Sequence, residues 1–304
     1  MGDLANKICY NDQTVDKTSQ FIKILPNDFP ESFRQMPDPP KQIFIEGELP
    51  LPEFKFLTVV GSRRYSKYGQ EVCDELIAGL ANYPIAIVSG LAIGIDTIAH
   101  KAALRNRLLT IAFPGSGLDR SVIHPSSNKR LADEIVASGG ALISELEPEQ
   151  PAGIHTFPRR NRLMAALADA VLIIEAGEKS GTLITARLAL DYNKEVLAVP
   201  GSIFNPGSKG TNELIRQGAT PITKPADILE VLGFKQDEEE AQGKLFENLS
   251  ANEQKIVDLL QVEPLPRDEL MLLLGLGASD ANTALALLEI KGLIKETLGE
   301  IRLA

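Results

Sequence analysis

Residues 57–100 read LTVVGSRRYSKYGQEVCDELIAGLANYPIAIVSGLAIGIDTIAH, and this stretch decides the fold. Two short runs rich in β-branched residues, LTVV (57–60) and IAIV (85–88), are each followed by a glycine turn. Apolar residues at helical spacing follow the first turn, over residues 66–81. Such alternation predicts a parallel sheet with helices packed on its faces. Both glycine turns then lie at the carboxyl edge of the sheet, where open α/β sheets bind ligands.

The same alternation continues to residue 234 and predicts six or seven strands in all. The segments LLTIAF, ALIS, AVLIIEA and EVLAVP are typical of strands, and the segments between them of helices. Because AVLIIEA (170–176) is almost wholly apolar, we expect it in the centre of the sheet. The predicted fold class is therefore α/β, with a doubly wound, mostly parallel sheet over residues 50–234.

The chain differs in character at its two ends. Residues 1–49 are a polar arm and a proline-rich lead-in, with one short helical turn near Glu31–Arg34 and a strand at IFIEG (43–47) that we expect along the sheet edge. Residues 235–248 form an acidic linker. Residues 249–304 predict three helices followed by a hairpin with glycine in its turn, which together indicate a winged-helix domain.

Composition limits the partners and the compartment. The 304 residues carry a net charge of −10, but residues 50–234 contain 19 basic and 19 acidic residues, whereas residues 235–304 contain 7 and 14. Any anion site must therefore come from a local cluster rather than from net charge. Neither of the two cysteines has zinc-ligand spacing, and no apolar run approaches the ~20 residues that span a bilayer. We expect a cytoplasmic protein with no metal, no signal peptide and no membrane contact.

Five segments are candidates for the binding site. GSRR (61–64), SGLAIGID (89–96), PGSG (114–117) and EAGEKSGT (175–182) follow strands, and FPRRNR (157–162) precedes the central strand. Arginine binds phosphate bidentately, and a helix N-terminus favours an anion. Three of these segments also have a purely structural interpretation. GSRR could be a tight turn with solvated arginines, FPRRNR a basic turn paired with the acidic residues at 145–149, and EKSGT the start of a helix capped by Ser180.

Asp96 and His100 are interpreted as structural. They lie four residues apart and so share a helix face. We expect Asp96 to hold a neighbouring loop and His100 to be a buried, hydrogen-bonded histidine. The histidines are scattered along the sequence, so no metal site is predicted.

The glycine loops match neither common nucleotide motif. SGLAIGID is G-x-x-x-G-x-D rather than G-x-G-x-x-G, and EKSGT lacks the order G-x-x-x-x-G-K-[ST]. These mismatches argue against a nucleotide as the ligand. A nucleotide-binding or nucleotide-hydrolysing Rossmann-like protein is kept as the alternative.

In its motifs the chain resembles the DNA-processing protein A family (DprA, also called Smf). The resemblance rests on VGSR (60–63), SGLAIGIDTIAH (89–100), the PGSGLD…HP…N run (114–128), ISELEP (143–148), FPRRNRLMAAL (157–167), EAGEKSGTLITARLAL (175–190) and PGSIFNPGSKGTNELIRQGA (200–219). It implies an extended Rossmann-like domain that binds single-stranded DNA without strong sequence preference. It also implies delivery of a RecA-type recombinase, homodimers, a role in natural transformation and recombination, no cofactor and no enzymatic activity.

By motif, the resemblance also implies which residues bind DNA. They are Gly61, Ser62, Arg63, Arg64, Ser89, Gly90, Ala92, Gly94, Phe157, Arg159, Arg160, Asn161, Arg162, Lys179, Ser180, Gly181 and Thr182. Replacing Arg63 or Arg160 by alanine is expected to weaken single-strand binding without unfolding the domain.

Two departures from the family are visible. Many members begin with a helical domain, for which residues 1–25 are too short. The predicted winged helix is acidic, and its third helix carries only Lys291 as a base, so we favour a protein-contact or dimer-supporting role over duplex reading. A related family of nucleoside-monophosphate hydrolases uses P-G-G-x-G-T-x-x-E, but Thr185 stands where its glutamate would be.

Overall fold

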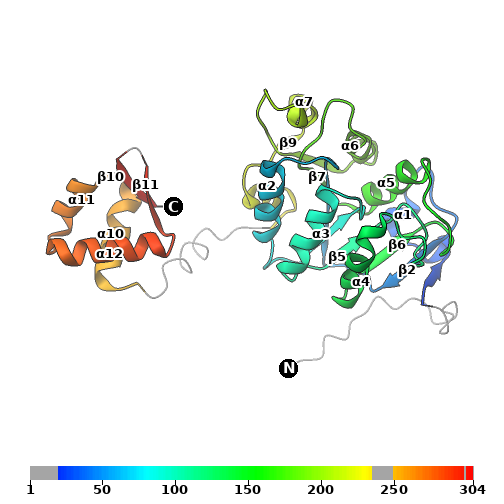
Figure 1. Ribbon diagram of the computed structural model, residues 1–304, viewed down its shortest axis with the longest axis horizontal. Helices are drawn as coiled ribbons and strands as arrows, with labels where there is room; N and C mark the ends of the chain where they lie inside the picture. Colours follow the sequence, from blue (N-terminus) through cyan, green and yellow to red (C-terminus); the bar gives the residue numbers. More distant parts are fainter. Residues whose placement is uncertain (1–19, 235–248, 298, 304) are drawn as a thin grey trace. The chain divides into compact units, whose positions relative to one another are not determined.

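The computed structural model describes residues 20–234, 249–297 and 299–303, so the predicted acidic linker and most of the predicted arm lie outside the described residues. The chain divides into two compact units, Met1–Lys235 and Gln236–Ala304, which are treated separately below (Figure 1). Of the described helices, none is long and apolar enough to cross a membrane.

A mostly parallel sheet forms the large unit (Figure 1). Within residues 20–234 it has nine strands in the order β1-β2-β6-β5-β4-β3-β7-β8-β9. Those from β3 onward are parallel to one another, which confirms the predicted α/β class. The parallel strands are β3 (Lys55–Val60), β4 (Ile85–Ser89), β5 (Thr110–Ala112), β6 (Ala141–Ser144), β7 (Ala170–Ile173), β8 (Glu195–Ala198) and β9 (Thr220–Pro221).

The proline-rich lead-in belongs to this sheet. The predicted strand at IFIEG is β2 (Ile43–Gly47), which pairs antiparallel with β6 at the edge. A further strand, β1 (Ile22–Ile24), pairs with β2 and was not predicted. The predicted helical turn is α1 (Glu31–Arg34), where Phe33 is fully buried and meets Phe113 edge-on at 6.5 Å.

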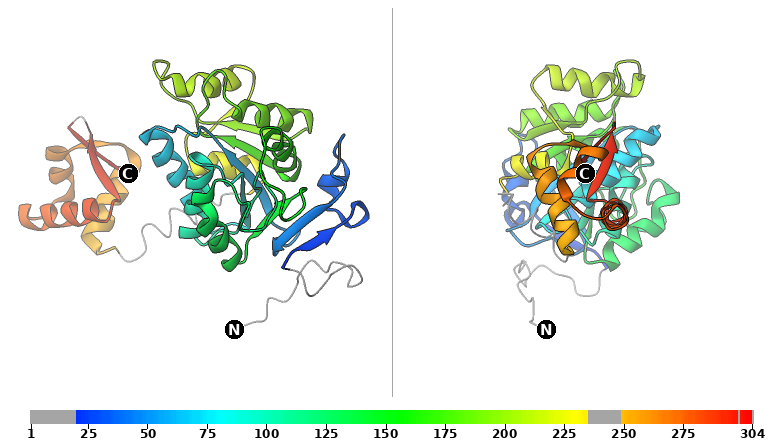
Figure 2. Two further views of the ribbon diagram at one scale, coloured as in Figure 1. Left: turned by 45° about the vertical axis from the view of Figure 1, so that its right-hand side comes forward. Right: turned by 90° about the vertical axis from the view of Figure 1, so that its left-hand side faces the viewer.

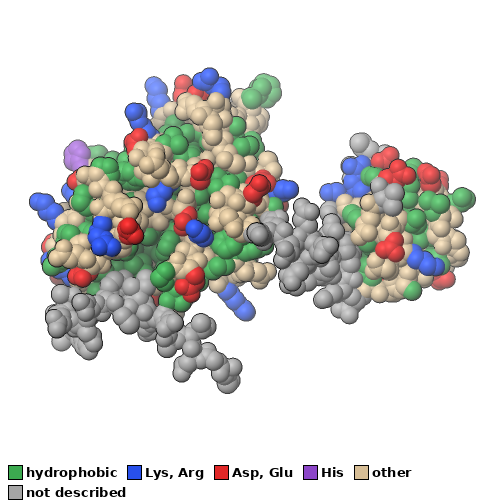
Figure 3. Space-filling view, turned by 180° about the vertical axis from the view of Figure 1, so that it is seen from behind, with side chains coloured by type: hydrophobic (Ala, Val, Ile, Leu, Met, Phe, Trp, Pro, Cys, Tyr) green, Lys and Arg blue, Asp and Glu red, His purple; other side chains and the backbone are tan. Residues whose placement is uncertain are grey.

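Helices cover both faces of the sheet (Figure 2). One face packs against α2 (Lys67–Ala78), α3 (Ile95–Arg105), α4 (Lys129–Ala137) and α8 (Pro225–Val231). The other packs against α1, α5 (Thr156–Leu167), α6 (Thr182–Asp191) and α7 (Lys209–Arg216). Short 3-10 turns lie at η1 (Pro26–Asp28), η2 (Ser126–Asn128) and η3 (Pro206–Ser208). On the face shown in Figure 3, basic and acidic side chains are interspersed, in keeping with the neutral composition of residues 50–234.

The strand order reverses at β3. The chain runs from β3 to β4, β5 and β6 on one side, and β7, β8 and β9 lie on the other side. The carboxyl ends of β3 and β7 are therefore neighbours, with their loops diverging to helices on opposite faces. Such a switch point leaves a crevice at the sheet edge where ligands bind in open α/β folds.

Helix α5 contains the whole of FPRRNR. It starts at Thr156 and includes Pro158 in its first turn. Proline is tolerated there because the first-turn N–H groups have no intrahelical acceptor. The segment FPRRNR is consequently helical, and its successive side chains point in different directions around the helix.

The C-terminal unit is the predicted winged helix. Its helices are α10 (Ala251–Val262), α11 (Arg267–Leu274) and α12 (Ala278–Ile290), and the hairpin is β11 (Ile294–Thr297) with β12 (Glu300–Leu303). A capping box begins α10, since Ser250 N donates to Glu253 Oε2 at 2.8 Å and Glu253 N donates to Ser250 Oγ at 3.3 Å. A third short strand, β10 (Leu265–Pro266), pairs with β12 and was not predicted.

Candidate nucleic-acid interface

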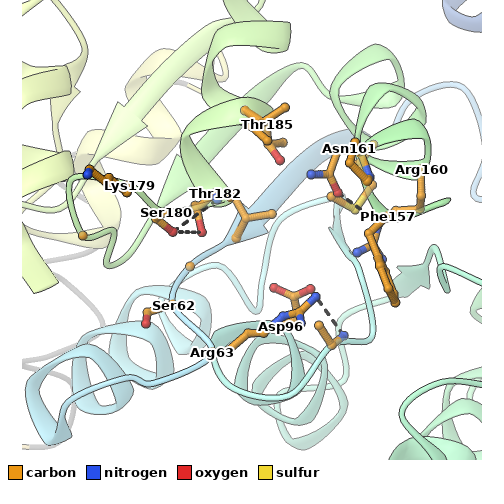
Figure 4. A pocket seen from close by; sticks show the side chains of 18 of the residues that line it. Ser62, Arg63, Asp96, Phe157, Arg160, Asn161, Lys179, Ser180, Thr182 and Thr185 are labelled. Carbon is orange, nitrogen blue, oxygen red and sulfur yellow. Dashed lines mark hydrogen bonds between the residues drawn. The ribbon is translucent and has the colours of Figure 1, made fainter. Parts of the chain in front are cut away.

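A cleft of about 570 Å³ lies at the carboxyl edge of the sheet (Figure 4). Its walls are the loops after β3, β4 and β7 and the first turns of α5 and α6. The predicted residues that line it are Gly61, Ser62, Arg63, Arg64, Ala92, Asp96, Phe157, Arg160, Asn161, Lys179, Ser180, Gly181 and Thr182. The cleft is also lined by Val60, Pro158, Met164, Gly177, Ile184 and Thr185, which lie within the quoted motifs but were not predicted to bind DNA, since most of them are apolar.

Three cations of the cleft have no acidic partner. Among the described residues, no carboxylate forms an ion pair with Arg63, Arg64 or Lys179. The turn that carries the two arginines is held by Ser62, whose Oγ donates to Arg64 O at 2.8 Å and accepts from Arg64 N at 3.0 Å. The two guanidinium groups are therefore left to interact with an external anion.

The start of α6 forms the opposite wall. Its N-cap residue is Gly181, and no side chain caps it, although Ser180 Oγ accepts from Thr182 N at 3.2 Å. A Cβ atom at Gly181 would meet nothing within 4 Å, so this backbone is open to a ligand. Together with Lys179, the helix N-terminus offers an anion both a positive dipole end and a full charge.

Phe157 supplies a flat apolar surface beside these cations. The guanidinium carbon of Arg63 lies 5.4 Å from the centre of its ring (Figure 4). The ring packs on Gly115, where a Cβ atom would come within 2.5 Å of Phe157 Cε1. A cation and an aromatic ring at one point suit a nucleotide, which presents a phosphate and a base.

Arg160 is part of the framework of the cleft. Only 7% of the residue is exposed, and its guanidinium donates to the carbonyls of Gly90 and Phe113. Burial lowers the pKa of Arg160 to about 10, an effect opposed by Asp96, so the group is charged at neutral pH. The expectation that alanine here leaves the fold intact is therefore revised, since it would strand two carbonyls and a buried carboxylate.

Asp96 holds the loop after β4. Its buried carboxylate accepts from Ala92 N at 3.4 Å. Burial raises the pKa of Asp96, and the neighbouring Arg160 is the strongest opposing influence. Leu91 in this loop has φ 58°, an unfavourable conformation for a branched side chain.

Two polar residues that position the cleft loops lie within the quoted motifs but were given no role from the sequence. Asn128 donates from Nδ2 to Leu91 O and to Thr97 Oγ1, both at 2.8 Å, and so clamps the strained loop. Glu175 is 2% exposed and accepts from Ser66 N at 2.8 Å and from Ser66 Oγ at 2.6 Å. Glu175 thereby ties the loop after β7 to the start of α2. In the sequence it is the carboxylate that ends an apolar strand and begins EAGEKSGT.

Several residues of the predicted set lie outside the cleft. Arg159 and Arg162 both pair with Glu145, as the structural interpretation of the basic segment proposed. Ser89 is buried and donates from Oγ to Val59 O at 2.7 Å. Gly90 leaves room for Arg160, because a Cβ atom at Gly90 would lie 2.5 Å from the Arg160 guanidinium carbon. Gly94 has φ 91° and packs against the Ser62–Arg63 backbone.

His100 is buried beneath the cleft. Its Nδ1 lies 2.7 Å from Thr110 Oγ1, which itself donates to Ile87 O at 2.8 Å. The Thr110 hydroxyl therefore accepts from His100, which places the ring proton on Nδ1. Burial, with a further contribution from Arg160, lowers the pKa of His100 to about 3, so the ring is neutral. Within the described part of the chain, no group of three His, Cys, Asp or Glu residues could hold a metal ion.

Two protein-family models match this chain. The family model described as DNA recombination-mediator protein A matches residues 20–233, which is more than half of the chain. A second model, the DprA winged helix domain, matches residues 240–299. The chain belongs to the DNA recombination-mediator protein A family.

The relatives in this family include well-separated bacteria. Protein Smf of Escherichia coli is 45% identical over 206 residues, which cover 68% of this chain and 54% of that protein. DNA processing protein DprA of Streptococcus pneumoniae is 43% identical over 214 residues, covering 70% of this chain and 74% of that one. The chain thus spans about half the length of the Escherichia coli relative.

Two solved structures of family members share the fold. DNA processing protein A of Streptococcus pneumoniae matches with a TM-score of 0.66 and 40% identity, over 71% of this chain and 75% of that one. The protein from Helicobacter pylori matches with a TM-score of 0.62 and 33% identity, over 70% and 95% respectively. The structural work on the Helicobacter pylori protein concerns its single-stranded DNA binding mode.

Proposed function

We propose that this protein binds single-stranded DNA in the cleft at the carboxyl edge of the sheet. The observation that carries this proposal is that Arg63, Arg64 and Lys179, which pair with no described carboxylate, line one cleft with the ring of Phe157. The cations and the α6 N-terminus suit backbone phosphates, and the ring suits a base. Family membership and the single-strand binding of the Helicobacter pylori relative support the same choice of ligand.

Binding is proposed to have no strong sequence preference. Contacts from cations and backbone N–H groups go to phosphates, which are the same in every nucleotide. A phenylalanine ring stacks on any base, because every base has a π-face. A duplex fits this arrangement poorly, since its bases are already stacked and cannot reach Phe157.

Competition between labelled oligonucleotides tests this proposal. A fluorescent single strand is bound to the full chain and displaced by unlabelled single strands or by duplex of the same sequence. Single strands of mixed composition should compete equally well, and duplex should compete at least tenfold less. Equal or tighter binding of the duplex would contradict the proposal.

We further propose that the bound strand is handed to a RecA-type recombinase, in DNA uptake, natural transformation and recombination. Support comes from the family, whose model names a recombination mediator. Both partners would be met in the cytoplasm, where we propose that the protein acts. The test is recombinase ATPase activity on single strands coated with single-strand-binding protein: the full chain should raise the rate, and no increase would contradict loading.

The protein is proposed to act as a homodimer formed through the large unit. Two strongly exposed apolar side chains on the loop after β8 support a self-contact, since Ile203 is 76% and Phe204 88% exposed. Light scattering after size exclusion should give a mass near twice 33.0 kDa for the full chain. Replacing both residues by serine should shift that mass toward the monomer if this loop takes part.

We propose no catalytic role for the cleft. Thr185 lines it at the position where a nucleoside-monophosphate hydrolase would need a carboxylate. Of the cleft-lining residues that the structure describes, Asp96 is the one acid, and its carboxylate is engaged with Ala92 N. Incubation with nucleoside monophosphates should release no free base; turnover would favour the alternative of a nucleotide-hydrolysing protein.

We also propose a role for each segment of the chain. Residues 50–234 carry the DNA-binding cleft, residues 1–49 extend that domain at its edge, and residues 235–248 link it to the winged helix of residues 249–304. For the winged helix we propose protein contact rather than duplex reading, because its third helix, α12, contains no basic residue. Lys291, which follows α12, already donates from Nζ to Glu253 Oε1 at 2.6 Å.

A further inference from the structure

His124 lies beside the cleft and was assigned no role by its motif. It is exposed, and its ring centre lies 5.7 Å from that of Phe157, with an angle of 54° between the ring planes. The Arg63 guanidinium lies over the same phenylalanine at 5.4 Å. Three flat groups, from the loop after β3, the segment 114–125 and the start of α5, therefore meet at Phe157.

The positions of the two rings are fixed by their backbones. Ile123, the neighbour of His124, is 3% exposed and anchored in the core cluster under α4. Phe157 rests on Gly115, and the hydroxyl of the preceding Thr156 donates to Gly115 O. The segment 114–125 thus carries one ring and the start of α5 the other, and these two segments are hydrogen-bonded to each other.

The segment 114–125, which carries His124, lies beside acidic residues over part of its length. At residues 117–119 it runs along the acidic segment 145–150, since Gly117 N donates to Gln150 O at 2.8 Å and Asp119 N to Pro148 O at 2.9 Å. Glu145 is neutralised by two arginines, but Glu147 meets only the uncharged Gln42 among its described partners. A phosphate near these carboxylates would be repelled, whereas an uncharged base would not.

We propose that His124 is a second base-contacting residue, on which a nucleobase of the bound single strand stacks next to the base held by Phe157. Because the two rings are inclined by 54°, one base cannot lie flat on both, so each ring takes its own base. The strand then leaves the cleft over the segment 114–125. This inference rests on the proposed function and adds to it a direction for the strand.

The test combines a ring deletion with a base deletion. His124→Ala should weaken the binding of a fully based single strand about fivefold, and His124→Phe should restore it. On an oligonucleotide of the same length whose central sugars carry no bases, His124→Ala should have no effect, because the phosphates are unchanged. The slope of log affinity against log salt should be equal in wild type and His124→Ala, since no phosphate contact is lost.

His155→Ala is the matched control, because His155 is also exposed and lies two residues before Phe157, with no ring contact among the described residues. It should bind like wild type. The inference is overturned if His124→Ala binds normally, if it loses as much on the abasic strand, or if His155→Ala loses as much. Failure of wild type to bind any single strand would instead overturn the proposed function.

Discussion

The cleft of the large unit and the winged helix differ in how their cations are paired. In the cleft, no described acid pairs with Arg63, Arg64 or Lys179. In the described winged helix, three of the five cations are paired: Arg267 with Glu296, Lys291 with Glu253 and Arg302 with Glu300. An unpaired cation can exchange its counterions for a phosphate, whereas a paired one must first lose its partner.

The difference shows why net charge does not predict where this protein has cations available to an anion. Residues 50–234 are neutral as a whole, yet they concentrate unpaired cations at one sheet edge. Even within FPRRNR, packing separates the arginines, since Arg159 and Arg162 pair with Glu145 and Arg160 is bonded to backbone carbonyls. The cations available to DNA are therefore fixed by tertiary contacts rather than by composition.

The largest expected effect is on stability, through the buried arginine of the cleft. Arg160→Ala leaves two carbonyls without their donor and removes the charge that most favours the ionised Asp96 carboxylate, and should lower the free energy of unfolding by about 3 kcal/mol. Urea unfolding of the full chain measures it. The exposed Arg107, which has no described ion pair, is the control, and its alanine variant should change stability by less than about 0.5 kcal/mol. Equal effects would mean that Arg160 does not hold the cleft together.

A second effect depends on pH and on His100 beneath the cleft. Because the folded state lowers the pKa of His100 to about 3 from 6.5, the unfolded chain takes up the proton first, and stability falls as the pH drops below about 6.5. From pH 7 to about pH 5 this amounts to about 2 kcal/mol. Asp96, with its raised pKa, acts in the opposite direction, but it does so in wild type and in His100→Gln alike. The variant should lose less stability over this range than wild type; identical pH dependence would refute the buried neutral ring.

Removal of the aromatic surface should weaken DNA binding by about tenfold. Phe157→Ala loses the stacking of one base but no phosphate contact, so single-strand affinity should fall while its salt dependence stays unchanged. Phe157→Tyr retains the ring and should bind like wild type. A normal affinity of the alanine variant would show that the base is held elsewhere.

The smallest effect is expected in the winged helix. The double replacement of Arg267 and Arg302 by alanine removes two paired cations and should change single-strand affinity by less than about twofold. Fluorescence anisotropy with the same labelled oligonucleotide measures it. A loss as large as that of a cleft variant would show that the winged helix contacts the strand directly, and the contrast between the two units would fail.

The periodic features of the sequence predicted most of the fold. Apolar runs gave the parallel strands in order, and the capping box at Ser250 and Glu253 marked the start of the winged helix. The missed strands, β1 and β10, are only three and two residues long, so neither shows a recognisable alternation. These elements exist because a neighbouring strand offers them hydrogen bonds, which is not a local property of the sequence.

The sequence predicted which loops line the cleft, but it could not predict which of their side chains are bonded to other parts of the protein. Glycine turns after strands identified GSRR, SGLAIGID and EKSGT, because the carboxyl edge of a sheet collects such turns. The roles of Arg160 and Arg162 depend on Gly90, 70 positions away, and on Glu145, 17 positions away. Asn128 and Glu175 likewise act on residues 37 and 109 positions distant. Contacts of this kind are set by packing, which no local pattern encodes.

Single-strand binding over a salt series, with wild type beside Arg63→Ala and Arg107→Ala, tests the central claim most directly. Arg63 is an unpaired cation of the cleft, so its loss should lower affinity about tenfold and reduce the slope of log affinity against log salt by about 0.7 for each phosphate contact removed. Arg107 is equally exposed but precedes β5 at the opposite edge of the sheet, and its variant should match wild type. An unchanged slope for Arg63→Ala, or the same change for both variants, would contradict a cleft that binds the DNA backbone through its unpaired cations.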